Sequence, residues 1–222
     1  MAISENQQLS SSYTIADLTK TNQSLSEPNT PDSQWMIDNM VYLADMLEQL
    51  NSVVGPFNIL SGFRTKELQQ ALAAAGEPAT TRTSFHEAGR AVDIYPTNMS
   101  IIEYFGKILA NPDLLPKFAE VSIKPVQNAL HLAINVPGDN RSPKITALNT
   151  EKKYVGLSLE EIQNYAAPYM QAAQEIIADV SDAGQEIVFE SVGSSPIIPM
   201  AIGGGALILG YLLIFNKKKR LA

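Results

Sequence analysis

The sequence predicts an α+β domain that is followed by a C-terminal helix and one transmembrane helix. Helical patterns alternate with short strand-like runs between residues 13 and 137, which is the order expected for a sheet with helices packed against it. Residues 197–215 form a run without any charged side chain, and this length suits a membrane-spanning helix.

The first half of the domain is expected to be a helix, a strand and a second helix. Residues 33–53 repeat apolar side chains on one helical face. This stripe, read as core packing, consists of Met36, Met40, Leu43, Leu47 and Leu50. Residues 57–65 then predict a strand ending in a turn that presents Arg64, and a helix over residues 66–75 stops at Gly76.

The second half is expected to supply further strands around one more helix. Residues 92–95 predict a short strand with Asp93 as an inward carboxylate. A helix over residues 101–110 is closed by Asn111-Pro112, and residues 121–123 and 130–136 are strand-like. We find no internal repeat.

The chain changes character after Pro137. Residues 138–150 form a turn-rich connector, and a capping box of Ser158 and Glu161 precedes a helix that runs to about residue 180. This helix, with its scattered apolar residues, is typical of a packing or oligomerisation face. The unit of residues 138–196 thus joins the domain of residues 13–137 to the apolar tail.

Composition excludes several classes of protein. The net charge of −7 over 222 residues argues against nucleic-acid binding as the main function. Because the chain contains no cysteine, it has no disulfide framework and no thiolate metal site. Residues 1–12 lack the basic start and apolar centre of a cleavable signal peptide, and we expect a mobile polar arm there.

The chain contains only two histidines, His86 and His131, and both lie beside strand-like runs. Two imidazoles and one carboxylate such as Asp93 form a three-ligand zinc set that leaves a fourth position open for water. Gly89 would let the chain turn sharply between His86 and Asp93. The alternative is that each histidine is a hydrogen-bonded core residue.

The residues around these histidines resemble a known family. Ser61-Gly62-Phe63-Arg64, then Ser84-x-His86-x-x-Gly89-x-Ala91-x-Asp93, and then an apolar strand carrying His131 are similar to the zinc D-alanyl-D-alanine peptidases. That family includes bacterial carboxypeptidases and phage endolysins, on the fold shared with the hedgehog signalling domain. The resemblance covers roughly residues 13–137 and implies a small antiparallel sheet.

The resemblance also implies roles for individual residues. His86, Asp93 and His131 would be the ligands of Zn²⁺. Arg64 would hold a carboxylate or carbonyl of the substrate, for which its planar guanidinium is suited, and Ser84 would support the bound peptide. The alternative, if the family pattern is set aside, is that Arg64 is a solvated turn arginine and that Ser84 caps a helix or turn.

One departure from the family pattern concerns the general base. The family places an acidic residue shortly before the last histidine, commonly three positions earlier, where this chain has Asn128. Asparagine cannot accept a proton from water. Glu120 is the candidate replacement and Glu87 is the other local acid, although each also suits a plain surface charge. The family also has an aromatic residue directly before the last histidine, where this chain has Leu130.

The C-terminal tail is the second strong feature. At about 1.5 Å per residue, a helix over residues 197–215 reaches about 28 Å, close to the thickness of a bilayer interior of ~30 Å. The basic residues 217–220 follow, which suits anionic headgroups or phosphate. We therefore expect a single-pass C-terminal anchor rather than a buried soluble helix.

The positive-inside rule places the domain outside a cell, yet no export signal is recognised. The internal membrane of a phage would reconcile the charge rule with the lack of an export signal. The basic tail of residues 216–222 would then face the packaged genome, and capsid proteins would be neighbours of the domain. We therefore expect a virion-borne zinc peptidase that cuts peptidoglycan stem or cross-link peptides. The alternatives are a structural virion protein that keeps the fold without hydrolysis, and a wall-binding module without the metal.

Overall fold

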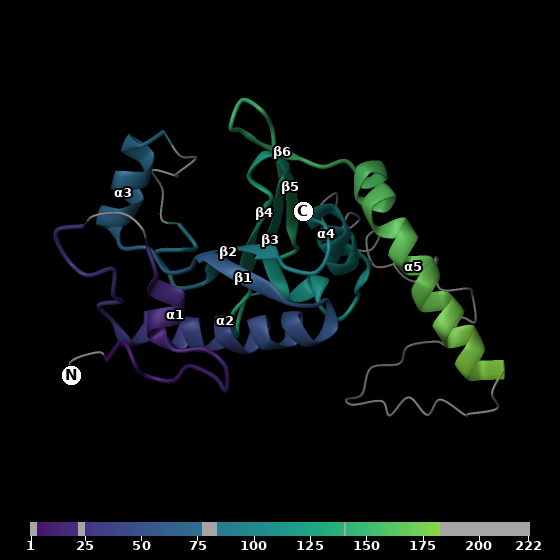
Figure 1. Cartoon of the computed structure of the whole chain (residues 1–222), viewed down its shortest axis with the longest axis horizontal. Helices are drawn as coiled ribbons and strands as arrows, with labels where there is room; N and C mark the ends of the chain where they lie inside the picture. Colours follow the sequence, from purple (N-terminus) through teal and green to yellow (C-terminus); the bar gives the residue numbers. More distant parts are fainter. Residues whose placement is uncertain (1–3, 22–24, 77–83, 140, 183–222) are drawn as a thin grey trace.

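The computed structural model describes residues 4–21, 25–76, 84–139 and 141–182. Within them, a six-stranded sheet has helices packed against it (Figure 1). The elements in chain order are α1 (Ile15–Thr19), α2 (Gln34–Val53), β1 (Phe57–Ser61), α3 (Lys66–Ala74), β2 (Ala91–Pro96), α4 (Ile101–Ala110), η1 (Leu115–Lys117), β3 (Phe118–Lys124), η2 (Pro125–Gln127), β4 (Ala129–Ile134), β5 (Lys144–Leu148), β6 (Tyr154–Gly156) and α5 (Leu159–Asp182).

The sheet is mixed, with strand order β1-β2-β4-β3-β5-β6. β3 and β5 run parallel, and the other neighbouring strands run antiparallel. The α+β class is therefore confirmed, but the expectation of a small antiparallel sheet is wrong. It failed because residues 138–150 were interpreted as a connector, whereas β5 lies in this stretch and extends the sheet beyond β3.

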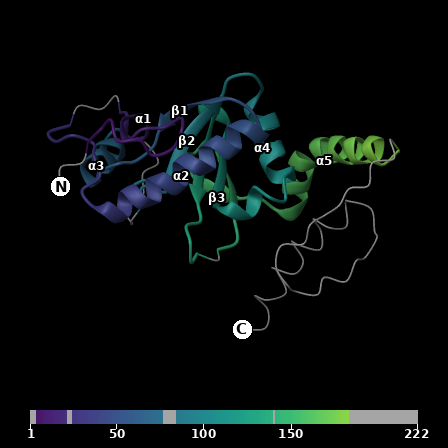
Figure 2. The same cartoon turned by 90° about the horizontal axis from the view of Figure 1, so that it is seen from below.

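One face of the sheet packs against α2 and α4 to form the core. In Figure 2, which views the domain from below, α2 crosses in front of the sheet. The side chains that fill the space between these layers include Met40, Leu43, Leu47, Val92, Ile94, Tyr104, Phe105, Ile108, Val121, Leu130 and Leu132, all buried. Because side chains alternate along a strand, the residues between these apolar ones point to the opposite face.

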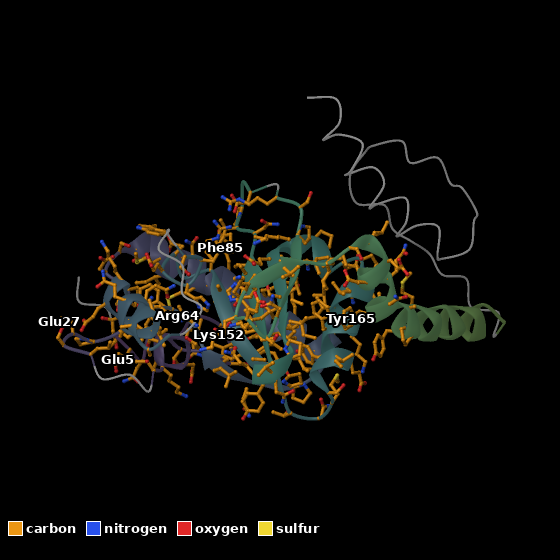
Figure 3. All side chains as sticks on the ribbon, turned by 90° about the horizontal axis from the view of Figure 1, so that it is seen from above. Glu5, Glu27, Arg64, Phe85, Lys152 and Tyr165 are labelled. Atoms are coloured by element: carbon orange, nitrogen blue, oxygen red, sulfur yellow. The ribbon has the colours of Figure 1, made fainter. Side chains whose placement is uncertain are left out.

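Two further segments pack onto this body. Residues 4–12 of the expected mobile arm contact the domain, since Leu9 is buried and the Ser11 hydroxyl donates to Glu48 at 2.7 Å. The capping box before α5 is confirmed by reciprocal bonds between Ser158 and Glu161. Tyr165 lies where α5 meets the domain, with its ring edge-on to Phe105 at 5.0 Å (Figure 3).

The structure corrects the expected membrane anchor. Among the residues that the structure describes, no helix is both long and apolar enough to cross a membrane. The expected span of residues 197–215 lies outside the described residues, as does the basic tail of residues 216–222. A transmembrane helix and a membrane localisation based on it therefore have no support in the structure.

Candidate metal centre

The centre begins with two strand residues that face each other. In the antiparallel pair of β2 and β4, Asp93 is directly opposite His131, and in the pair of β3 and β4, Ser122 is opposite His131 from the other side. Asp93 alternates with the core residues Val92 and Ile94, so its carboxylate points away from the core helices. The register of three strands thus places Asp93 and His131 side by side on the polar face of the sheet.

His86 reaches the same place from the turn before β2. The turn is closed by backbone bonds from Gly89 N and Arg64 N to the His86 carbonyl, and Gly89 has a φ of +70°. A side chain at Gly89 would also meet the Met36 carbonyl of α2 at 2.7 Å. Glycine therefore satisfies both the left-handed conformation and the close approach to α2. The sequence predicted the sharp turn at Gly89 but not the contact with α2.

A backbone carbonyl fixes the orientation of the His86 ring. His86 Nδ1 lies 2.6 Å from the Gly62 carbonyl oxygen, which can only accept, so Nδ1 carries the proton and donates. The lone pair is then on Nε2, the nitrogen that faces His131. This carbonyl-to-histidine arrangement is the usual outer support of a metal-binding imidazole.

The donor atoms of His86, Asp93 and His131 all lie within 4.8 Å of one another. His86 Nε2 is 3.2 Å from His131 Nδ1, His131 Nδ1 is 3.1 Å from Asp93 Oδ1, and His86 Nε2 is 3.7 Å from Asp93 Oδ2. Zinc–ligand bonds of about 2.0–2.2 Å in tetrahedral geometry require ligand atoms about 3.4 Å apart. These three residues could therefore hold a metal ion of this size.

The environment keeps two of these residues in the form that binds metal. Burial lowers the pKa of His86 well below its usual value, so the ring is neutral. Burial alone would raise the pKa of Asp93, but the nearby Lys124 ammonium and the contact with His131 outweigh it and hold this pKa well below its usual range. The centre thus offers a free imidazole nitrogen and an ionised carboxylate.

Two cations bind the Asp93 carboxylate. Arg64, labelled in Figure 3, comes from the turn after β1 and donates through Nη2 to Asp93 Oδ2 at 2.5 Å and through Nε to Ser61 Oγ at 2.9 Å. Lys124, at the end of β3, donates to Asp93 Oδ1 at 2.8 Å. Arg64 therefore lies at the centre, but its side chain is only 11% exposed and is paired with Asp93 rather than solvated.

Sequence reasoning missed Lys124 and the residues that surround it. Burial lowers the pKa of Lys124, but the attraction of Asp93 outweighs it and raises the pKa above its usual value, so the side chain is an ammonium ion. The phenol of Tyr154 on β6 interacts with Lys124, and burial raises its pKa. A lysine directly before a proline reads as a turn residue, and only the strand register shows that it shares a face with His131.

Asn29 is the other residue that sequence reasoning missed. This buried side chain donates to the carbonyl oxygens of Thr19 and Phe63 and accepts from Thr65 N. It thereby fixes the backbone on both sides of Arg64. No pattern in the sequence marks it, because its partners are distant in the chain.

The predicted supporting residues lie in different places. Ser84 is buried and its hydroxyl accepts from His86 N at 3.2 Å, so it caps the turn that carries His86. Glu120 interacts with Lys144 at 3.5 Å and accepts from Ser122, and in the described part of the chain it has no hydrogen bond or ion pair with the three candidate ligands. Asn128 is exposed in a left-handed turn with φ 48°.

Comparison of the chain with protein-family models, with curated proteins and with solved structures gives no significant match. The resemblance to the D-alanyl-D-alanine peptidases therefore stays a prediction from the motif. The coarser result, a cluster of His86, Asp93 and His131 that could hold a metal ion, rests on the structure itself.

Proposed function

We propose that this chain is a zinc-dependent peptidase that acts on peptidoglycan stem or cross-link peptides. The observation that carries the proposal is the convergence of one carboxylate and two imidazoles within 4.8 Å on the polar face of the sheet. The substrate class comes from the motif resemblance, which joins this ligand set to Arg64 and Ser84.

The donor set favours zinc over other common ions. Calcium and magnesium prefer oxygen ligands, whereas imidazole nitrogen suits zinc and its neighbours in the transition series. Three protein ligands are the number found in catalytic zinc sites, while structural sites use four. Bound zinc supplies Lewis-acid polarisation of a carbonyl and activation of water for hydrolysis.

The protein residues around the ligands position the substrate. Arg64 is fixed by its Nη2 bond to Asp93 and its Nε bond to Ser61, and its Nη1 donors could hold a carboxylate or carbonyl oxygen of the substrate. Asn29 fixes the backbone of the turn from which Arg64 projects. The Gly62 carbonyl keeps the His86 ring in its orientation.

A second candidate function is a structural protein that keeps the metal and has lost hydrolysis. Two observations favour it. Asn128 occupies the position where the resembled family has its general base, and Glu120 is engaged with Lys144 rather than with the centre. The two candidates share the metal and differ only in catalysis.

A digest of purified peptidoglycan with the zinc-loaded protein tests the proposal. New muropeptides, identified by mass spectrometry and absent with His131→Ala, would support the peptidase. Glu120→Gln would then show whether Glu120 is the base, because loss of turnover with zinc retained requires that role. Bound zinc without any cleavage would favour the structural protein, and a metal-free protein that cleaves would overturn the metal centre.

A further inference from the structure

The Lys124 ammonium donates to Asp93 Oδ1, the carboxylate oxygen that lies beside His131 Nδ1. A metal ion held by Asp93 and His131 would need this same oxygen. Asp93 Oδ1 lies 2.8 Å from Lys124 Nζ and 3.1 Å from His131 Nδ1. Lys124 is only 7% exposed, so water does not screen its charge effectively. In the metal-free protein, the Lys124 ammonium therefore already contacts one of the candidate metal ligands.

The charges around the centre are unusual for a metal site. Asp93 contributes one negative charge, while Arg64 and Lys124 contribute one positive charge each. Arg64 contacts Asp93 Oδ2, and Lys124 contacts Asp93 Oδ1. A neutral His86 adds none. A divalent ion that enters therefore meets neighbours that are already cationic, and the metal-free carboxylate is fully paired.

The two cations differ in how easily they can leave. Arg64 is a rigid planar group with a second anchor at Ser61. Lys124 holds Asp93 through a single ammonium on a flexible four-carbon stem, and it also interacts with the phenol of Tyr154. Lysine is the group that can give up the oxygen by rotating about its side-chain bonds.

We propose that Lys124 is a built-in competitor of the metal, which stabilises the metal-free centre through Asp93 and must release this carboxylate when a divalent ion binds. This inference rests on the proposed metal centre and adds a regulatory residue to it. Lys124 is thus a positioning residue that sets how tightly the centre binds metal. Loss of the ammonium should destabilise the metal-free protein and tighten metal binding together, because both follow from the same lost contact.

Replacement of Lys124 by methionine tests the inference, since methionine has a similar length and no charge. Zinc affinity is measured by competition with a chromophoric chelator, and thermal unfolding is followed with and without zinc. We expect K124M to bind zinc at least tenfold more tightly than the wild type. We also expect K124M to have a lower melting temperature than the wild type without zinc, and we expect this difference to become smaller when zinc is added.

Lys144→Met is the matched control. Lys144 lies on the same face of the sheet; its side chain is 65% exposed, and its ammonium pairs with Glu120 at 3.5 Å. This variant removes the same charge without touching Asp93, so its zinc affinity should stay within about twofold of the wild type. Equal gains in both variants would show a general charge effect and overturn the role of Lys124.

The outcomes separate this inference from the proposed function. Zinc bound equally, or more weakly, by K124M overturns the inference and leaves the metal centre intact. If neither folded protein binds zinc, the metal centre itself fails and the inference fails with it. If K124M is unfolded without metal, zinc-driven folding seen by circular dichroism supports the inference, and failure to fold at saturating zinc contradicts it.

Discussion

Asp93 and His131 face each other across β2 and β4, with His131 Nδ1 3.1 Å from Asp93 Oδ1. These two residues are far apart in the sequence, and the strand register alone brings them together. The same carboxylate holds the cations Arg64 and Lys124, whose side chains are 11% and 8% exposed. Asp93 is therefore the residue on which both the stability and the chemistry of the centre depend.

Replacement of Asp93 by asparagine is expected to destabilise the fold strongly. The substitution keeps the shape of the side chain but leaves the buried Lys124 and the half-buried Arg64 without their counter-charge, and the loss of one partner of a buried ion pair typically costs about 3–5 kcal/mol. The free energy of unfolding, measured with urea, checks this. The control Asp113→Asn changes an exposed turn residue and should stay within about 0.5 kcal/mol of the wild type; similar values for the two variants would contradict the prediction.

The metal-free protein should lose stability as the pH falls through about 6.5, the usual pKa of histidine. Burial lowers the pKa of His86 in the folded state, so the unfolded chain takes up a proton that the folded chain does not. The free energy of unfolding then decreases by up to about 1.4 kcal/mol per pH unit for this group. Asp93, whose folded pKa is also lowered, adds a further loss as the pH falls below about 4.

Urea unfolding at several pH values in the presence of a chelator measures this dependence. The difference between the wild type and His86→Gln isolates the contribution of His86, because the glutamine cannot take up the proton. A wild-type slope between pH 6.5 and pH 5 that the variant reproduces in full would rule out this role for His86.

The turn at Gly89 is expected to tolerate no side chain. Alanine there must adopt a left-handed conformation, which costs about 1–2 kcal/mol, and its Cβ would meet the Met36 carbonyl at 2.7 Å. Gly138 has a φ of +92°, but among the described residues a Cβ at this position would meet no atom within 4 Å. Gly89→Ala should therefore destabilise the protein by at least about 1 kcal/mol more than Gly138→Ala, and thermal unfolding of the two variants decides this.

Much of the fold could be predicted because its signals are local. The apolar stripe of α2 repeats within one helix, and Met40, Leu43, Leu47 and Leu50 are buried as expected. β6 escaped prediction because it is short. β5 escaped because its pairing with β3 joins strands that are not consecutive in the chain. Such non-local pairing leaves no periodic pattern in the sequence.

The candidate ligands could also be predicted, because the chain has only two histidines and Asp93 follows His86 in a recognisable motif. Lys124 could not, since its contact with Asp93 depends on the register of β3 against β4. The sequence thus predicted the candidate ligand Asp93 but not the cation Lys124 that contacts it.

Restoration of an acid at residue 128 should increase hydrolysis if the chain is a weak peptidase. Asn128 has a φ of 48°, and aspartate tolerates this left-handed conformation better than glutamate does. A general base contributes about 10²–10⁴-fold, so Asn128→Asp should raise the rate of muropeptide release by at least tenfold. Asn128→Gly also tolerates the turn but has no carboxylate, and an equal rise in this control would exclude the acid as the cause.

The zinc content of the purified protein tests the central claim most directly. After dialysis against zinc and removal of free metal, elemental analysis should find about one zinc per wild-type chain, because three ligands suffice in a scaffold that fixes them. His131→Ala, which leaves His86 and Asp93 in place, should retain almost none. Stoichiometric zinc in folded His131→Ala, or none in the wild type, would contradict the metal centre.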